Sequence, residues 1–306
     1  MAPVTPVLTL AFGPHRVEML PLMGDHMRAH RVVILEEPPH PDFHRMLRRE
    51  TGIRTYLASG DFNFPRFALR ACRLYQHLFC TAGTAFYQVE PYLATARQLA
   101  EGKKPCTALE HRVWEHEREA AGALLAYYQA VTENNFAAVV QAVKAFAHAD
   151  ARRLRLRAAL RAEAINALVN RTEGNVYVEA GYIHLLLLQL LRDRVKPPVT
   201  VRVLYLLREP IRAVSGLPWR QHLGPGDVLT LRYTFGARAS RWDDLLAARS
   251  LIYVALLPKE ELLPREADPY PHLRRELHLC RFVNRLSYQE CAALYRRLVK
   301  PASRGR

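Results

Sequence analysis

Residues 31–39 of this 306-residue chain are Arg-Val-Val-Ile-Leu-Glu-Glu-Pro-Pro. The unbroken apolar run over 32–35 is typical of a strand that is buried on both of its faces, as strands of parallel sheets are. Two glutamates and two prolines follow the run, and proline ends a strand because it has no N–H to donate to a neighbour. The stretch therefore predicts a buried strand that ends in carboxylates.

Four further runs share this character, each rich in β-branched or aromatic residues and bounded by turn residues. They cover residues 7–12, 85–90, 175–180 and 199–207. Helical patterns lie between the runs, and strands that alternate with helices form a mostly parallel sheet with right-handed crossovers. The sequence therefore predicts an α/β fold in which helices flank a mostly parallel central sheet.

Two long segments fall outside this alternation. The first separates the third strand from the fourth and has the pattern of helices over 92–102, 109–131 and 136–171. The second begins after residue 208 with a glycine- and proline-rich stretch that predicts a loop, and continues with helical patterns over 242–257, 271–286 and 289–298. We expect an α/β core over 1–208 with a helical insertion at about 92–171, and a helix-rich C-terminal extension over 209–306.

The composition is that of a globular protein, with 50% apolar and 24% charged residues. No apolar run approaches the roughly 20 residues that cross a bilayer. The N-terminal residues lack the basic region of a signal peptide. Five cysteines at irregular spacings indicate free thiols in a reducing compartment. We therefore expect a cytoplasmic protein without a membrane span.

The chain is strongly basic, with 44 Lys and Arg against 29 Asp and Glu and a net charge of +15. Clustered cations bind nucleic acid by releasing counterions from phosphates. However, only six of these residues are lysines, and an arginine bias also fits a G+C-rich genome. The densest cluster alternates with Leu and Ala at helical spacing, which indicates a solvated helix face; it comprises Arg152, Arg153, Arg155, Arg157 and Arg161. Without a nucleic-acid-binding signature, nucleic acid stays a minor alternative.

Polar side chains follow every predicted strand. Parallel sheets bind ligands beyond the carboxyl ends of their strands, where the loops converge. Taken singly, a histidine after a strand is more often a hydrogen-bonded loop residue, and a glutamate before proline is a common solvated strand end. Their joint placement favours one shared site. Neighbouring side chains of a strand point to opposite faces, so we expect at most one of the adjacent glutamates to face the site. The residues are His15, Glu36, Glu37, Glu90, Glu179, His184 and Glu209.

The segments 161–166 and 174–184 resemble the TraB/GumN, ChaN and erythromycin-esterase superfamily, in which a helix carrying arginine precedes a strand that ends in G-x-x-H. Gly181 to His184 matches that motif. The nearest match to the family's Gly/His motif after the first strand is Gly13-Pro14-His15, with one intervening residue where the family has two. The resemblance covers about residues 7–190.

The resemblance implies an α/β fold with a metal-dependent hydrolase site in some members and haem or iron binding in another branch. On this hypothesis His15, Glu36 and His184 hold a divalent transition metal such as Zn²⁺ or Mn²⁺, whose bound water has a pKa near 7 and attacks a carbonyl group.

The other strand-end residues would then complete a hydrolytic site. Glu90 or Glu179 would act as the general base, and Arg161 would stabilise an oxyanion or anchor a substrate carboxylate. The remaining candidates would bind a small-molecule or peptide substrate; they are Gly13, Glu37 and Gly181.

Three hypotheses about function remain open. The first is the hydrolase, with or without a metal ion. The second is a non-catalytic protein that binds haem, iron or a small anion on the same scaffold, which the departure at Gly13-Pro14-His15 favours. The third is a helical interaction protein or a nucleic-acid-associated protein. Metal analysis separates the first two from the third, for which salt-dependent retention on nucleic acid would speak.

Overall fold

A computed structural model describes residues 6–60, 64–133 and 135–299 of the chain. Its five strands form one sheet in the order β3-β2-β4-β1-β5, and every neighbouring pair is parallel. The predicted α/β fold class is confirmed. Each strand lies within one of the five predicted runs: β1 Val7–Phe12, β2 Val32–Leu35, β3 Ala85–Gln88, β4 Val176–Ala180 and β5 Thr200–Tyr205.

Helices fill the connections between the strands and most of the chain after β5. Up to β4 they are the 3-10 helix η1 Val17–Met19 and the α-helices α1 Leu20–Arg28, α2 Phe43–Leu47, α3 Ile53–Ala58, α4 Pro65–Ala82, α5 Pro91–Ala100, α6 Ala108–Thr132 and α7 Phe136–Val169. After β4 they are α8 Leu186–Arg194, α9 Arg208–Ser215, α10 Pro225–Thr234, α11 Arg241–Leu256, α12 Pro271–Val283 and α13 Tyr288–Val299.

The prediction of a loop after residue 208 is confirmed for residues 216–224 and wrong on either side of them, where α9 and α10 form. Prolines and glycines of this stretch mark the ends of these helices. Pro225 stands at the first turn of α10, where its missing N–H costs nothing. Gly216 ends α9 in the left-handed conformation, with φ 69°, which a residue without a side chain adopts readily.

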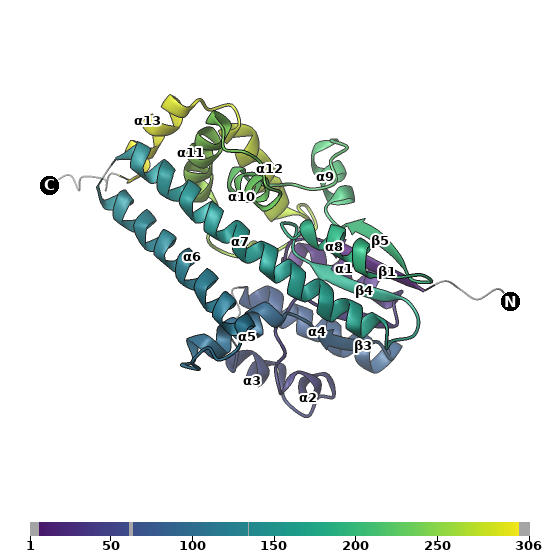
Figure 1. Ribbon diagram of the computed structural model, residues 1–306. Helices are drawn as coiled ribbons and strands as arrows, with labels where there is room; N and C mark the ends of the chain where they lie inside the picture. Colours follow the sequence, from purple (N-terminus) through teal and green to yellow (C-terminus); the bar gives the residue numbers. More distant parts are fainter. Residues whose placement is uncertain (1–5, 61–63, 134, 300–306) are drawn as a thin grey trace. The chain divides into compact units, whose positions relative to one another are not determined.

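Helices cover both faces of the sheet. On one face, Val178 packs in a single apolar cluster with Ile165 of α7 and Leu187 of α8. On the other face, the ring of Tyr75 in α4 lies 5.3 Å from that of Phe86 in β3. The strands are therefore shielded on both sides, as their continuous apolar runs predict. Figure 1 shows the strands with these helices.

The chain reverses its direction across the sheet at β4. The connections from β1 to β2 and from β2 to β3 advance toward one edge, through α1 and then through α2, α3 and α4. The connections from β3 to β4 and from β4 to β5 return toward the other edge, through α5–α7 and then α8. The loop after β4 therefore leaves the sheet in a different direction from the loops after its neighbours β1 and β2. Such a switch point is where open α/β sheets bind ligands.

The chain divides into two compact units, and the division differs from the predicted one at residue 208. The first contains the sheet and comprises the described residues within Met1–Arg97, Arg157–Gln221 and Glu260–Leu273. The second comprises those within Gln98–Leu156, His222–Lys259 and Arg274–Arg306.

The reason for this division is a shared core in the second unit. One buried cluster joins Val139 of the insertion with Leu229 and Cys291 from the C-terminal part of the chain. Neither segment forms a unit of its own, because each supplies only part of that core. Helices α6 and α7 run antiparallel within this unit (Figure 1), and Glu119 pairs with Arg152 between them.

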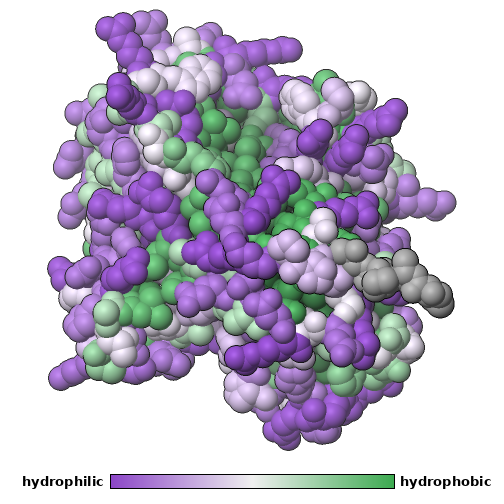
Figure 2. Space-filling view, turned by 45° about the vertical axis from the view of Figure 1, so that its right-hand side comes forward, coloured by the Kyte–Doolittle hydropathy of each residue, from purple (hydrophilic) through white to green (hydrophobic). Residues whose placement is uncertain are grey.

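Further features of the molecule concern membrane-spanning helices, the polarity of the surface and the state of the cysteines. No described helix combines the length and the apolar character that crossing a membrane requires. Hydrophilic side chains cover most of the face in Figure 2, with hydrophobic ones between and beneath them. The five cysteines form no disulfide bond.

The central strands should carry much of the stability of the sheet unit. We expect Leu10→Ala in β1 to lower the free energy of unfolding by about 2–5 kcal/mol, because Leu10 is fully buried and the substitution leaves a cavity. Leu125→Ala, at a side chain that is 63% exposed, is the control and should change it by less than about 0.5 kcal/mol. Urea unfolding followed by circular dichroism measures both, and equal effects would contradict the expectation.

Candidate functional site

Six of the seven strand-end residues predicted to form one site lie close together, in the unit that contains the sheet. The prediction is wrong for Glu209, which is the second residue of α9 and lines a different cavity. The six follow or end a strand: His15 after β1, Glu36 and Glu37 after β2, Glu90 after β3, and His184 in the turn after β4, whose penultimate residue is Glu179. Two arginines of α7 complete the group; they are Arg157 and Arg161. The site stands at the switch point, as the geometry of open α/β sheets favours.

The carboxylate of Glu36 lies at the centre of this group, and its side chain is only 2% exposed. Its Oε1 is 2.9 Å from Nη2 of Arg157, 3.4 Å from Nη1 of Arg161 and 3.0 Å from Nε2 of His184. Burial alone would raise the pKa of Glu36, but the charges of His184, Arg161 and Arg157 outweigh burial and hold the pKa well below its usual range.

Glycine at position 181 permits the close approach of these groups. The N–H of Gly181 donates a hydrogen bond to Oε2 of Glu36. A Cβ atom at this position would lie 3.2 Å from Cδ2 of His184 and 3.3 Å from Oε2 of Glu36, which is tight on both sides. The G-x-x-H motif thus begins with glycine for a packing reason.

Gly13 also has a packing role. A Cβ atom on Gly13 would stand 2.8 Å from Cδ1 of Leu206, so a side chain there would force Leu206 to move. Its N–H donates to the carbonyl oxygen of Ala180. These contacts hold the loop after β1 against the ends of β4 and β5; the predicted substrate-binding role of Gly13 stays a prediction.

Arg161 ties the ends of two strands together. Its Nε donates to the carbonyl oxygen of Val89 at 3.0 Å, and its Nη2 donates to the carbonyl oxygen of Glu179. Arg157, one turn earlier in α7, donates from Nε to Oε2 of the fully buried Glu90 at 2.9 Å. The other carboxylate oxygen of Glu90 has no hydrogen-bond partner among the described residues.

The prediction that the arginine cluster forms a solvated helix face is wrong for these two members. The Arg161 side chain is 2% exposed and that of Arg157 is 20% exposed. Both turn toward the glutamates because a buried carboxylate is strongly destabilising without a cation. By contrast, Arg152 is exposed and pairs with Glu119.

His15 makes a separate ion pair with Glu179. Its Nε2 is 3.2 Å from Oε1 of Glu179, and 34% of the imidazole side chain is exposed while Glu179 is almost completely buried. Desolvation lowers the pKa of His15, but the charge of Glu179 and the bond to it, with smaller effects of Glu36 and Glu37, raise the pKa to about 9. His15 is therefore an accessible cation at neutral pH.

Glu37 has a different environment from its neighbour Glu36. Its Oε2 accepts a hydrogen bond from Nε2 of Gln88 at 2.8 Å. Burial, with the nearby charge of Glu179, raises the pKa of Glu37 to about 7, although the bond from Gln88 and the charge of His15 oppose the shift. The expectation that at most one of the two glutamates faces the site is wrong: they point to opposite sides, and both sides border the site.

Two buried tyrosines complete this side of the site, and the sequence prediction missed them. The hydroxyl groups of Tyr75 and Tyr177 make no hydrogen bond with a described residue. Burial and the charge of Glu179 raise the pKa of each well above its usual value. Tyr177 lies two residues before Glu179, so the period of a strand could have placed it on the same face. The sequence could also have indicated Arg157 as a site residue, because it lies four residues before Arg161 and therefore on the same face of the helix.

The predicted metal ligands do not form a favourable set. His15 contacts Glu179, whereas Glu36 contacts His184 and two guanidinium groups, whose positive charge opposes a cation at that carboxylate. Among the described residues, no group of three or more His, Cys, Asp or Glu side chains could hold a metal ion. The zinc, manganese, iron and haem assignments stay predictions.

Comparison with known proteins adds one relative. The chain is 29% identical to an uncharacterized protein of Archaeoglobus fulgidus over 296 residues, which cover 96% of this chain and 100% of that protein. No family model and no solved structure matches the chain.

The two backbone bonds of Arg161 should make lysine a poor substitute. We expect Arg161→Lys to lower the free energy of unfolding by about 1–3 kcal/mol, because one ammonium group cannot reach both carbonyl oxygens and leaves a buried acceptor unpaired. Arg48→Lys, at an exposed ion pair with Glu50, is the matched control and should leave the free energy of unfolding almost unchanged. Chemical denaturation of both variants tests this; a tolerated Arg161→Lys would contradict it.

His15 should make stability depend on pH. Because the pKa of His15 is raised in the folded protein, the stability it contributes is fully present below pH 6.5, the usual pKa of a histidine, and is lost as the pH rises through about 9. One third of the side chain is exposed, so screening reduces the contribution to about 1 kcal/mol. We expect His15→Gln to remove this part of the pH dependence, and His44→Gln in α2 to keep it. Urea denaturation at pH values below, within and above this window measures the free energy of unfolding of the wild type and the two variants. The same dependence on pH in all three proteins would contradict the expectation.

Proposed function

We propose that the protein is a hydrolase in which His15 and Glu37 perform acid–base catalysis on an ester or amide bond. The observation that carries the proposal is the ion pair of His15 with Glu179, in which a buried carboxylate orients a partly exposed imidazole at the switch point of the sheet. A histidine held by a carboxylate is a recurrent arrangement for proton transfer.

The different pKa values assign the two roles. Glu37, with a pKa of about 7, is the base that accepts a proton from the attacking water. His15, with a pKa of about 9, is protonated at that pH and donates its proton to the leaving oxygen or nitrogen. The water oxygen forms the new bond to the carbonyl carbon, the bond to the leaving group breaks, and a proton passing from Glu37 to His15 through solvent restores both.

The other predicted residues take supporting roles in this proposal. Glu179 orients His15 instead of serving as the base, and Arg161 positions the strand ends through its backbone bonds. Arg157 remains partly exposed and is the guanidinium that a substrate oxyanion or carboxylate would reach. The resemblance of residues 174–184 to the erythromycin-esterase superfamily favours the same reaction class and a small-molecule or peptide substrate.

The test is a screen of chromogenic esters, lactones and peptides, followed by kinetics of Glu37→Gln and His15→Gln. We expect each substitution to lower kcat by about 10²- to 10⁴-fold, the usual contribution of a positioned acid or base. The wild-type rate should rise with pH through about 7 and fall through about 9, because it requires deprotonated Glu37 and protonated His15. Glu37→Gln should abolish the lower limb and His15→Gln the upper limb.

Glu266→Gln, at an exposed glutamate of the same unit, is the control and should keep wild-type kinetics. The same rates measured with a chelator test the metal-dependent alternative. Activity that is lost on chelation, or that survives in both site variants, would contradict the acid–base proposal, as would no turnover of any substrate class.

A further inference from the structure

A cavity separate from the strand-end site lies at the carboxyl end of β5, an edge strand of the sheet. Its volume is about 430 Å³, within the range of small-ligand pockets. Its walls come from α1, β5, the start of α9 and the loop that follows α9, all in the unit that contains the sheet. It contains none of the residues of the strand-end site described above.

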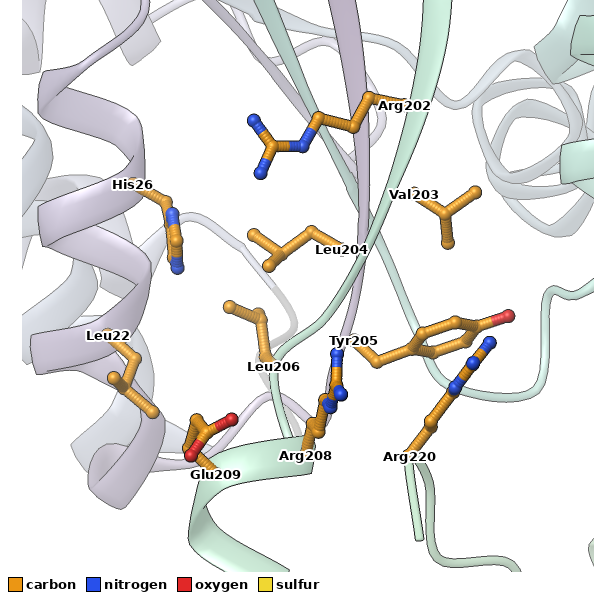
Figure 3. Close-up of a pocket in the computed structure, with 10 residues that line it drawn as sticks. All are labelled: Leu22, His26, Arg202, Val203, Leu204, Tyr205, Leu206, Arg208, Glu209 and Arg220. Atoms are coloured by element: carbon orange, nitrogen blue, oxygen red, sulfur yellow. The ribbon is translucent and has the colours of Figure 1, made fainter. Parts of the chain in front are cut away.

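Three arginines line this cavity, namely Arg202, Arg208 and Arg220. They come from three segments: β5, the first residue of α9 and the loop after α9. None of the three forms a hydrogen bond or ion pair with a described residue, so their charges are available to a ligand in the cavity. Figure 3 shows their side chains around the cavity.

The rest of the lining is both apolar and polar. Leu204 and Leu206 lie on the side of β5 that faces Leu22 of α1, and Tyr205 lies on the other side, so the cavity wraps around the free edge of the strand (Figure 3). Among the described strands, β5 pairs with β1 alone, so the backbone groups of its outer edge can bond to a ligand. His26 adds an imidazole, and Glu209 adds one carboxylate that can accept a hydrogen bond from a ligand hydroxyl.

These features together identify the kind of ligand. Guanidinium groups in a fork geometry bind phosphate oxygens with two hydrogen bonds each, so unpaired arginines on the two sides of the strand edge suit a ligand that carries a phosphate dianion better than a neutral one. The leucines and Tyr205 suit an apolar or aromatic body attached to that anion. We propose that this cavity binds a small phosphate monoester with an organic body, the class to which nucleoside monophosphates belong.

The test is titration calorimetry of the full chain with AMP, with inorganic phosphate and adenosine as partial probes. We expect AMP to bind at one site and more tightly than inorganic phosphate or adenosine. Phosphate alone would contact the arginines, and adenosine alone would contact the leucines and Tyr205. Arg202→Gln and Arg220→Gln should each weaken AMP binding by about tenfold or more, the effect of losing a charge-assisted hydrogen bond. Arg202→Lys should restore only part of the affinity, since lysine lacks the fork.

The matched control is Arg54→Gln, which removes the same charge from an exposed position on α3 outside the cavity. It should leave the affinity for AMP unchanged. Equal weakening by Arg54→Gln would show attraction to the net charge alone and overturn the site. Adenosine or inorganic phosphate binding as tightly as AMP, or no saturable binding of AMP up to about 1 mM, would overturn it as well.

Discussion

The buried carboxylate of Glu36 is the constraint from which the rest of the site follows. A buried carboxylate is strongly destabilising unless cations and hydrogen-bond donors surround it. Here the donors come from α7 and from the turn that joins β4 to α8, so one side chain fixes where these two segments meet the end of β2. Arg161 then extends the connection to the backbone of two strand ends. The loop after β4 is consequently held by polar contacts as well as by apolar packing.

The alternation of a strand explains why two neighbouring glutamates acquire different chemistry. Glu36 faces the arginines of α7, and their charge keeps its pKa low. Glu37 points the other way, toward Gln88, and a neutral amide offsets burial much less than a guanidinium does. Adjacent residues of one strand end therefore divide the site into a rigid, ion-paired side and a side whose carboxyl group titrates near neutrality. The second side is where proton transfer is physically favoured.

The sequence predicts the parts of the molecule that depend on local pattern. The apolar runs located all five strands, and the polar residues at the ends of four of them located the edge of the sheet where they meet; Glu209, after the fifth, lies apart from them. Contacts between distant segments were not predictable in this way. The pairing of Arg157 with Glu90 joins residues 67 positions apart, and the core that Val139 shares with Cys291 depends on how two separate segments pack. Helices α9 and α10 were missed because Gly216 and Pro225 were interpreted as loop residues when they mark helix ends.

Arginine has two opposite uses in this chain, and net charge does not distinguish them. Arg161 is buried and has its charge matched by glutamates, so it contributes nothing to the field outside the protein. Arg202 carries the same charge without a partner and faces a cavity. A formal charge of +15 counts both equally. The charge available to a ligand is set by the arginines that remain unpaired, among them the three that line the cavity at β5. The net charge therefore does not by itself tell how much positive charge nucleic acid or a small anion would meet at any one place on the protein.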